Sequence, residues 1–127
     1  MSGVEGVKFM IKNAENCLLK FFWTVPSCVP ATSFETAGAS IGVSEVEEML
    51  KWKEIVALGE MMNFPGVINR DPEVIAKCNV AIEYGKKIDG HAPGIRGFEL
   101  ERYASAGIST DHECFCWKRL WKKFRTE

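Results

Sequence analysis

A chain of 127 residues has room for one domain with a modest core. Its 16 basic and 17 acidic residues leave a formal net charge of −1, so no strong overall field favours nucleic acid or an anionic surface. No apolar run approaches the roughly 20 residues of a membrane span, and no secretion signal is evident at the N-terminus. Five cysteines without framework-like spacing predict free thiols and a cytoplasmic location.

The first part of the chain predicts a helix followed by a buried strand. Apolar residues over 3–12 have the spacing of a short helix. Residues 18–25 form a continuous aromatic and aliphatic run that ends at Pro26, which is typical of a strand buried on both faces. A loop over 26–42, rich in Ser, Thr, Pro and Gly, follows and is long enough to have a function.

A second helix and strand are predicted directly after this loop. Ser44 and Glu47 fit a capping box ahead of an apolar helical face, so a helix is expected over 44–52. Residues 55–58 are aliphatic and predict the next strand. The helix would return the chain to the beginning of that strand.

The remaining elements continue the alternation. Asp71 and Pro72 are suited to begin a helix, and Gly85 is placed to end it. A strand over 87–90, a helix over 97–106 and a strand over 108–111 are expected after it. Alternating strands and helices imply right-handed crossovers and a parallel sheet. The predicted fold class is therefore α/β, with about four parallel strands and intervening helices.

Three potential metal ligands follow three successive predicted strands. Glu60, His91 and His112 come after the strands at 55–58, 87–90 and 108–111. His91 and His112 are the chain's two histidines. Because parallel strands open onto a shared mouth at their carboxyl ends, we expect these side chains to converge. Carboxylate and imidazole ligands suit a divalent metal such as zinc, iron or manganese. Purely structural histidines are the alternative, since no local motif such as HExxH is present.

Other residues are candidates for the surroundings of such a site. Glu113 is a candidate for proton transfer or substrate contact, and Asp111 for orienting its neighbour His112. Solvated loop carboxylates are the alternative for both. Candidates for the walls of a substrate pocket are Ser27, Cys28, Met62 and Asn63. Methionine at such positions is more typical of packing, and Cys28 has no adjacent base, which favours an inert thiol.

Four strings resemble the adenine deaminases of the amidohydrolase superfamily: VPSCVPATSFETAGA, LGEMMNFPGVI, DGHAPG and GISTDHEC. The resemblance runs from about Gly6 to Cys114 and covers a middle portion of a family member. It implies that residues 1–114 form part of a (β/α)8 TIM-type barrel, since a whole barrel needs about 250 residues. It also implies a metal-dependent hydrolase of purine metabolism that converts adenine and water into hypoxanthine and ammonia.

In this family, a glutamate after the fourth strand and histidines after the fifth and sixth bind a two-metal centre, and these match Glu60, His91 and His112. The resemblance also makes Glu60 a catalytic candidate. Family members carry an HxH pair after the first strand and an aspartate after the eighth, and this sequence contains neither. We therefore expect the isolated chain to deaminate adenine weakly or not at all, unless a companion barrel chain or self-association completes the site.

The likeness stops at the last residues. Residues 115–127 form a divergent, basic and amphipathic tail that suits a membrane surface, a partner's groove or the sheet edge. A shifted reading frame is a further interpretation of this tail. A zinc cluster of His112, Cys114 and Cys116 is disfavoured by its tight spacing. A non-enzymatic partial barrel that self-associates, or binds a partner through this tail, is thus the alternative function.

Overall fold

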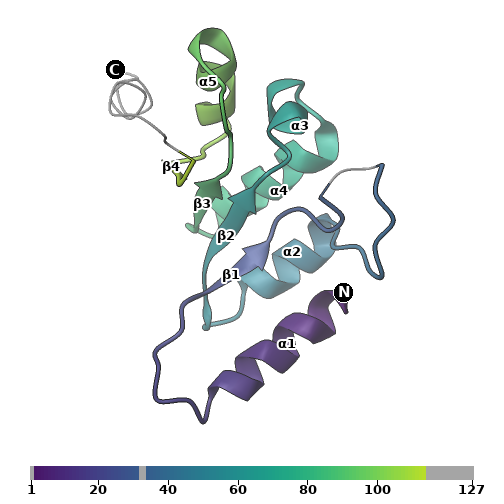
Figure 1. Ribbon diagram of the computed structural model, residues 1–127, viewed down its shortest axis with the longest axis vertical. Helices are drawn as coiled ribbons and strands as arrows, with labels where there is room; N and C mark the ends of the chain where they lie inside the picture. Colours follow the sequence, from purple (N-terminus) through teal and green to yellow (C-terminus); the bar gives the residue numbers. More distant parts are fainter. Residues whose placement is uncertain (1, 32–33, 114–127) are drawn as a thin grey trace.

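Strands and helices alternate along the chain, and all the strands run the same way (Figure 1). The computed structural model describes residues 2–31 and 34–113. Within these residues the strands form one sheet in the order β1-β2-β3-β4, with every neighbouring pair parallel. The described sheet is open, and its parallel strands with intervening helices confirm the predicted α/β fold class. The elements in order are α1 (Gly3–Ala14), β1 (Trp23–Pro26), α2 (Val43–Leu50), β2 (Ile55–Met61), α3 (Phe64–Ile68), α4 (Pro72–Glu83), β3 (Lys87–Gly90), α5 (Gly97–Ala104) and β4 (Thr110–Asp111).

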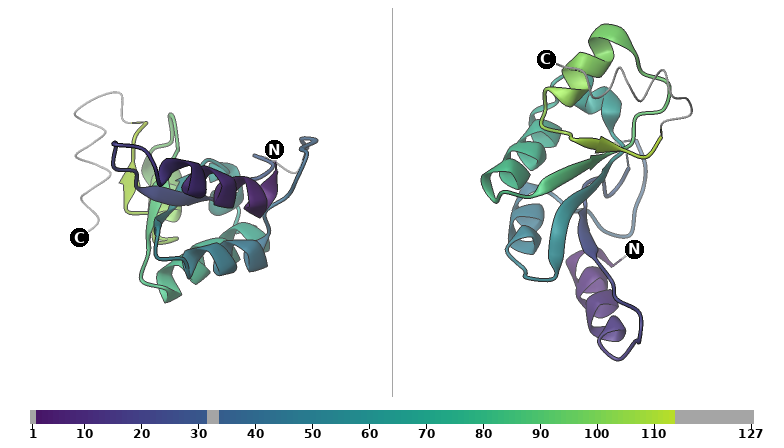
Figure 2. Two further views of the ribbon diagram at one scale, coloured as in Figure 1. Left: turned by 90° about the horizontal axis from the view of Figure 1, so that it is seen from below. Right: turned by 90° about the vertical axis from the view of Figure 1, so that its left-hand side faces the viewer.

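The hydrophobic core lies where α2 and α4 pack side by side against one face of the sheet (Figure 2). Leu58 of β2 and Ile88 of β3 are fully buried there, together with Met49 of α2 and Cys78 of α4. Burying one aliphatic side chain of this size contributes about 1.5–3 kcal/mol to folding. Val56, two residues before Leu58 in β2, is 45% exposed, and it lies where the register between β1 and β2 shifts.

Helix α4 begins and ends as the sequence predicts. The Asp71 carboxylate accepts hydrogen bonds from the backbone N–H groups of Glu73 (3.0 Å) and Val74 (3.2 Å), and Pro72 occupies the first turn. Gly85 follows the helix with a φ of +64°, a conformation that favours glycine. These local signals therefore determine where α4, one of the two core helices, begins and ends.

The predicted capping box of α2 is wrong. The helix begins at Val43, after an extended Gly42, so the residue placed to cap it is Glu45 rather than Glu47. The Glu45 carboxylate accepts the Gly42 N–H at 3.0 Å. Glu47 instead pairs with Lys51, one turn along the helix, at 2.8 Å.

The predicted strand over 18–25 is largely wrong, because only Trp23–Pro26 pairs with β2. Leu18, Leu19 and Phe22 are exposed, with Leu18 fully so. The cause is position: β1 is an edge of the described sheet, and nothing among the described residues covers the chain before it. Helix α1, which precedes this segment, has no fully buried residue.

The other boundaries shift modestly. Strand β2 extends to Met61, so Glu60 lies inside the strand rather than after it. Helix α5 ends at Ala104, and β4 is limited to Thr110–Asp111. Helix α3 was not predicted; Asn63 caps it by accepting the Gly66 N–H at 3.0 Å. None of the described helices combines the length and apolar character needed to cross a membrane.

Candidate metal centre

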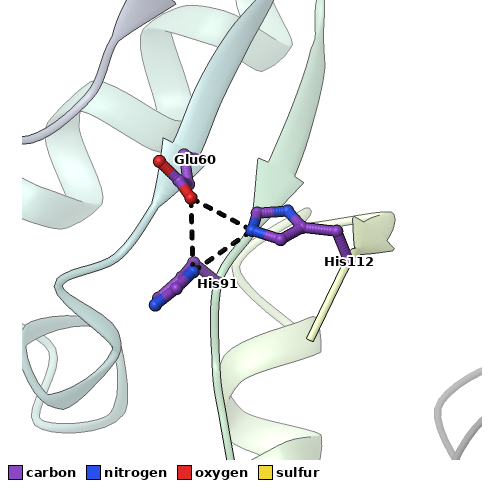
Figure 3. A group of neighbouring side chains, drawn as sticks. All are labelled: Glu60, His91 and His112. Carbon is purple, nitrogen blue, oxygen red and sulfur yellow. Dashed lines mark hydrogen bonds and ion pairs between the residues drawn. The ribbon is translucent and has the colours of Figure 1, made fainter. Parts of the chain in front are cut away.

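Glu60, His91 and His112 converge at the carboxyl ends of β2, β3 and β4 (Figure 3). Oε1 of Glu60 lies 3.0 Å from Nε2 of His112 and 3.3 Å from Nδ1 of His91. The same two ring nitrogens are 3.2 Å apart. One carboxylate oxygen and two imidazole nitrogens therefore meet at one point, as the strand ends predicted.

The sheet register explains this convergence. Met61 of β2 is paired with Gly90 of β3, and Gly90 is paired with Asp111 of β4. Each candidate ligand is one residue from this row: Glu60 precedes it, while His91 and His112 follow it. A parallel sheet thus brings three positions that are distant in sequence to one level.

The backbone of Glu60 is strained, and hydrogen bonds to its carbonyl hold it in place. Its φ is +30°, in the region that favours glycine, and the β2–β3 register is irregular between Leu58 and Met61. Irregularities of this kind re-aim side chains and gather beside active sites. The Glu60 carbonyl accepts hydrogen bonds from the Ser27 hydroxyl and the Met62 N–H, both at 2.7 Å. These contacts hold the carboxylate toward the histidines.

Tyr103 of α5 braces the backbone beneath the site. Its hydroxyl donates to the Met61 carbonyl at 2.8 Å and accepts the His91 N–H at 2.9 Å. The side chain is 1% exposed, and this burial raises the pKa of its hydroxyl, which keeps the proton on the donor. A Cβ at Gly90 would approach this hydroxyl to 3.1 Å and the Thr110 carbonyl to 2.6 Å, so glycine is required for the close approach.

The three facing atoms suit a cation. A carboxylate oxygen and the lone pairs of neutral imidazoles are all hydrogen-bond acceptors, so they repel one another unless a proton or a metal ion lies among them. Their side chains are 46% (Glu60), 29% (His91) and 43% (His112) exposed, which leaves the cluster open to solvent. Oxygen and nitrogen donors of this kind fit a divalent metal with an open coordination position.

Asp89 takes the place that the sequence analysis gave to Asp111. Its Oδ2 lies 3.2 Å from Nδ1 of His112, on the side of the ring away from Glu60. The Asp111 carboxylate instead accepts the backbone N–H of Glu113 at 2.7 Å. The Glu113 carboxylate lies 3.7 Å from Nδ1 of His91, beside the cluster.

Three of the four candidates for pocket walls line a hollow that the cluster residues do not line. Ser27 is buried beneath Glu60, and the Asn63 amide caps α3. Cys28 is half-buried, with its Sγ 3.9 Å from Sδ of Met61. Ser27, Cys28 and Asn63 line a hollow of about 140 Å³ beside the beginning of α4, whereas Met62 does not line it. None of the three cluster residues lines this hollow.

A parallel α/β sheet with acid and imidazole groups at the carboxyl ends of its strands is typical of barrel hydrolases. The chain belongs to the amidohydrolase family, whose sequence model matches residues 1–116. The open sheet is thus part of the TIM-type barrel of that family.

Curated adenine deaminases are similar to most of this chain. It is 50% identical over 123 residues to that of Methanosarcina barkeri and 53% identical over 123 residues to that of Methanothermobacter thermautotrophicus, covering 97% of this chain in both cases. It is 54% identical over 112 residues, or 88% of this chain, to that of Desulfatibacillum aliphaticivorans. These matches confirm the resemblance inferred from the four strings. The chain spans only 22%, 23% and 20% of these relatives, respectively.

Proposed function

We propose that this chain is a segment of an adenine deaminase that supplies part of a metal-dependent active site. The observation that carries the proposal is the meeting of Glu60, His91 and His112 at one point. The similarity to adenine deaminases supports adenine as the substrate, and hydrolytic deamination of adenine yields hypoxanthine and ammonia. Net hydrolysis breaks the bond between C6 and the amino nitrogen and forms a bond between C6 and the oxygen of water.

In this proposal the three residues hold a divalent ion, of manganese, iron or zinc. Such an ion would supply a Lewis acid that lowers the pKa of water toward neutrality. Glu60 contributes Oε1, His91 contributes Nδ1 and His112 contributes Nε2, because these atoms face one another. Both imidazoles have to be neutral at these nitrogens in order to bind.

Hydrolysis also requires a proton to move from water to the departing amino nitrogen. Glu113 is a candidate for this transfer because its carboxylate lies beside the cluster, 3.7 Å from Nδ1 of His91. Ser27 acts through the Glu60 carbonyl and is a positioning residue in this proposal. Cys28, Met62 and Asn63 remain candidate walls of the adenine pocket, supported by their place beside the ends of β1 and β2.

We further propose that a companion barrel chain or a second copy of this chain covers its exposed apolar groups. Leu19 is 71% exposed, Phe22 is 68% exposed and Val56 is 45% exposed. The chain's two histidines both lie in the cluster, so a second metal would need imidazoles from elsewhere. The 127-residue chain alone is therefore expected to release ammonia from adenine slowly or not at all. The free thiols of Cys17, Cys28 and Cys78 support a reducing cytoplasm as its location.

Metal uptake tests the centre directly. The purified chain is dialysed against manganese, iron(II) or zinc, and bound metal is counted by elemental analysis. We expect about one ion per chain in the wild type and a loss of uptake in Glu60→Gln and His91→Ala. Glu99→Gln, a change at an exposed glutamate of α5, is the matched control and should bind like the wild type. Equal uptake in all four proteins would refute the centre.

Activity is a separate readout. The chain is mixed with an adenine deaminase from which the matching segment has been deleted, and ammonia release from adenine is measured. Recovery of activity with the wild type, but not with His112→Ala, is the expected result. Recovery with both proteins would show that His112 has no part in the reaction.

A further inference from the structure

Asp89 contacts His112 on the side of the ring opposite the cluster. Asp89 lies in β3, one strand away, and its Oδ2 is 3.2 Å from Nδ1 of His112. The other ring nitrogen of His112, Nε2, faces Glu60 Oε1 at 3.0 Å. The imidazole thus lies between a carboxylate that is outside the candidate ligand set and one that belongs to it.

The neutral His112 ring has one proton for two carboxylates, Asp89 at 3.2 Å from Nδ1 and Glu60 at 3.0 Å from Nε2. The same Glu60 oxygen can accept a proton from Nδ1 of His91, at 3.3 Å, which leaves the His112 proton for Asp89. A carboxylate only accepts hydrogen bonds, so Nδ1 has to carry the proton in order to bond to Asp89. In a neutral ring the lone pair is then on Nε2, which points toward Glu60 and His91. A carboxylate that holds the far nitrogen of a metal-binding histidine fixes both its tautomer and its orientation.

Thr110 holds Asp89 in turn. Its hydroxyl donates to Oδ1 of Asp89 at 2.6 Å, so the two oxygens of this carboxylate serve different partners. The pairing of Asp89 with Thr110 in the β3–β4 ladder fixes the distance between the two strands at this point. The strand pairing therefore supports the contact, in addition to the side chains themselves.

We propose that Asp89 is a positioning residue that, supported by Thr110, holds His112 with Nδ1 protonated and Nε2 aimed into the cluster. The metal-binding meaning of this contact rests on the proposed function, but the tautomer is a property of the metal-free chain. Asp89 and His112 are 37% and 43% exposed, and an exposed pair of this kind contributes little to stability. The effect of removing Asp89 should therefore appear in the histidine, with little change in folding.

Long-range ¹H–¹⁵N NMR correlation spectra of the ¹⁵N-labelled, metal-free chain report which ring nitrogen carries the proton. With two histidines in the sequence, His91→Gln assigns the signals. The spectra are recorded in alkaline buffer, and the ring ¹⁵N shifts themselves distinguish a neutral ring from a protonated one. We expect Nδ1–H for His112 in the wild type and a shift toward Nε2–H in Asp89→Ala. Nε2–H in the wild type, or an unchanged tautomer in Asp89→Ala, overturns the proposal.

A second pair of variants keeps the test sharp if Asp89→Ala does not fold. Thr110→Val removes the hydroxyl that holds Asp89 and should weaken the preference for Nδ1–H, whereas Thr110→Ser should retain it. Ser109→Ala, at the exposed neighbouring residue, is the control and should resemble the wild type. A Thr110→Val spectrum identical to that of Thr110→Ser would contradict the support assigned to Thr110.

Metal affinity separates this proposal from the proposed function. If the wild type binds a divalent metal, Asp89→Ala should bind it about 10–100-fold more weakly, and an unchanged affinity overturns the positioning role. If the wild type binds no metal, the proposed metal centre fails. The tautomer measurement then still supports or overturns the Asp89 contact by itself.

Discussion

The helix-covered face of the sheet and the rim at its carboxyl end are built on different principles. On the helix-covered face, Leu58, Ile88 and Cys78 are fully buried among apolar neighbours. On the rim, Glu60 and His112 are nearly half exposed, and Glu60 has a strained backbone. The first region gains stability from burial, whereas the second brings acceptor atoms together at some cost in stability. Substitutions in the two regions should therefore have separable effects on folding and on metal binding.

The largest expected effect on folding belongs to the helix-covered face. Leu58→Ala removes a fully buried side chain and should lower the free energy of unfolding by about 2–5 kcal/mol. The measurement is urea denaturation followed by circular dichroism, with Val56→Ala as the matched control on the same strand. Because Val56 is 45% exposed, its loss should cost about 1 kcal/mol or less. Equal losses in the two variants would contradict the comparison.

Tyr103→Phe should affect both regions, because Tyr103 is buried and its hydroxyl braces the rim. Removing this hydroxyl leaves the Met61 carbonyl and the His91 N–H without their partner, at a cost of about 1–3 kcal/mol in the free energy of unfolding. Metal affinity should fall as well, since His91 loses its anchor. Tyr84→Phe is the control: the Tyr84 hydroxyl binds Glu47 at the surface, so its removal should cost about 0.5 kcal/mol or less.

A glycine at position 60 should change metal binding and folding stability in opposite directions. Glu60→Gly removes the carboxylate and should abolish metal binding, but it suits a φ of +30° better than any other residue. The metal-free Glu60→Gly chain should therefore be about 1 kcal/mol more stable than Glu60→Ala, which keeps the strained backbone. Thermal unfolding without metal compares the two variants. An alanine variant as stable as the glycine variant would show that the backbone of Glu60 is not strained.

Much of the helix-covered face and of the metal cluster could be predicted from the sequence. Strand alternation with Asp71, Pro72 and Gly85 predicted α4, and the strand ends predicted the cluster. Periodicity did not show that residues 18–22 stay exposed, because an apolar run records hydrophobicity and not what covers it. The Asn63 cap of α3 carried a recognisable signal, since an Asn cap with Pro in the first turn, here Pro65, is typical of a helix start.

Asp89 and Tyr103 were missed for another reason. Their importance comes from contacts between strands and from a helix back to the strands, which require the register of the sheet. The sequence analysis expected Asp111 to orient His112. Asp89 makes that contact, and Asp111 accepts the Glu113 N–H. Sequence reasoning placed the candidate ligands because each is at the carboxyl end of its own strand, whereas the supporting residues become apparent only when the strands are aligned.

The smallest effect concerns thiol chemistry and leaves folding unchanged. Burial raises the pKa of the Cys78 thiol to about 11, from an ordinary value of 9.0, whereas Cys17 is exposed. Near pH 8, Cys78 should therefore remain protonated and unreactive while Cys17 is alkylated by iodoacetamide. Mass spectrometry of the resulting peptides measures both, and urea should expose Cys78 to the reagent. Rapid labelling of Cys78 in the folded chain would indicate that the core opens easily.

X-ray absorption spectroscopy of the zinc-loaded chain tests the central claim most directly, because it reports the atoms bound to the ion. The cluster predicts two imidazole nitrogens and a carboxylate oxygen around zinc, at about 2.0–2.2 Å. One imidazole should disappear from the spectrum in His112→Ala. A wild-type spectrum without imidazole scattering, or one unchanged in that variant, would show that Glu60, His91 and His112 do not form the metal centre.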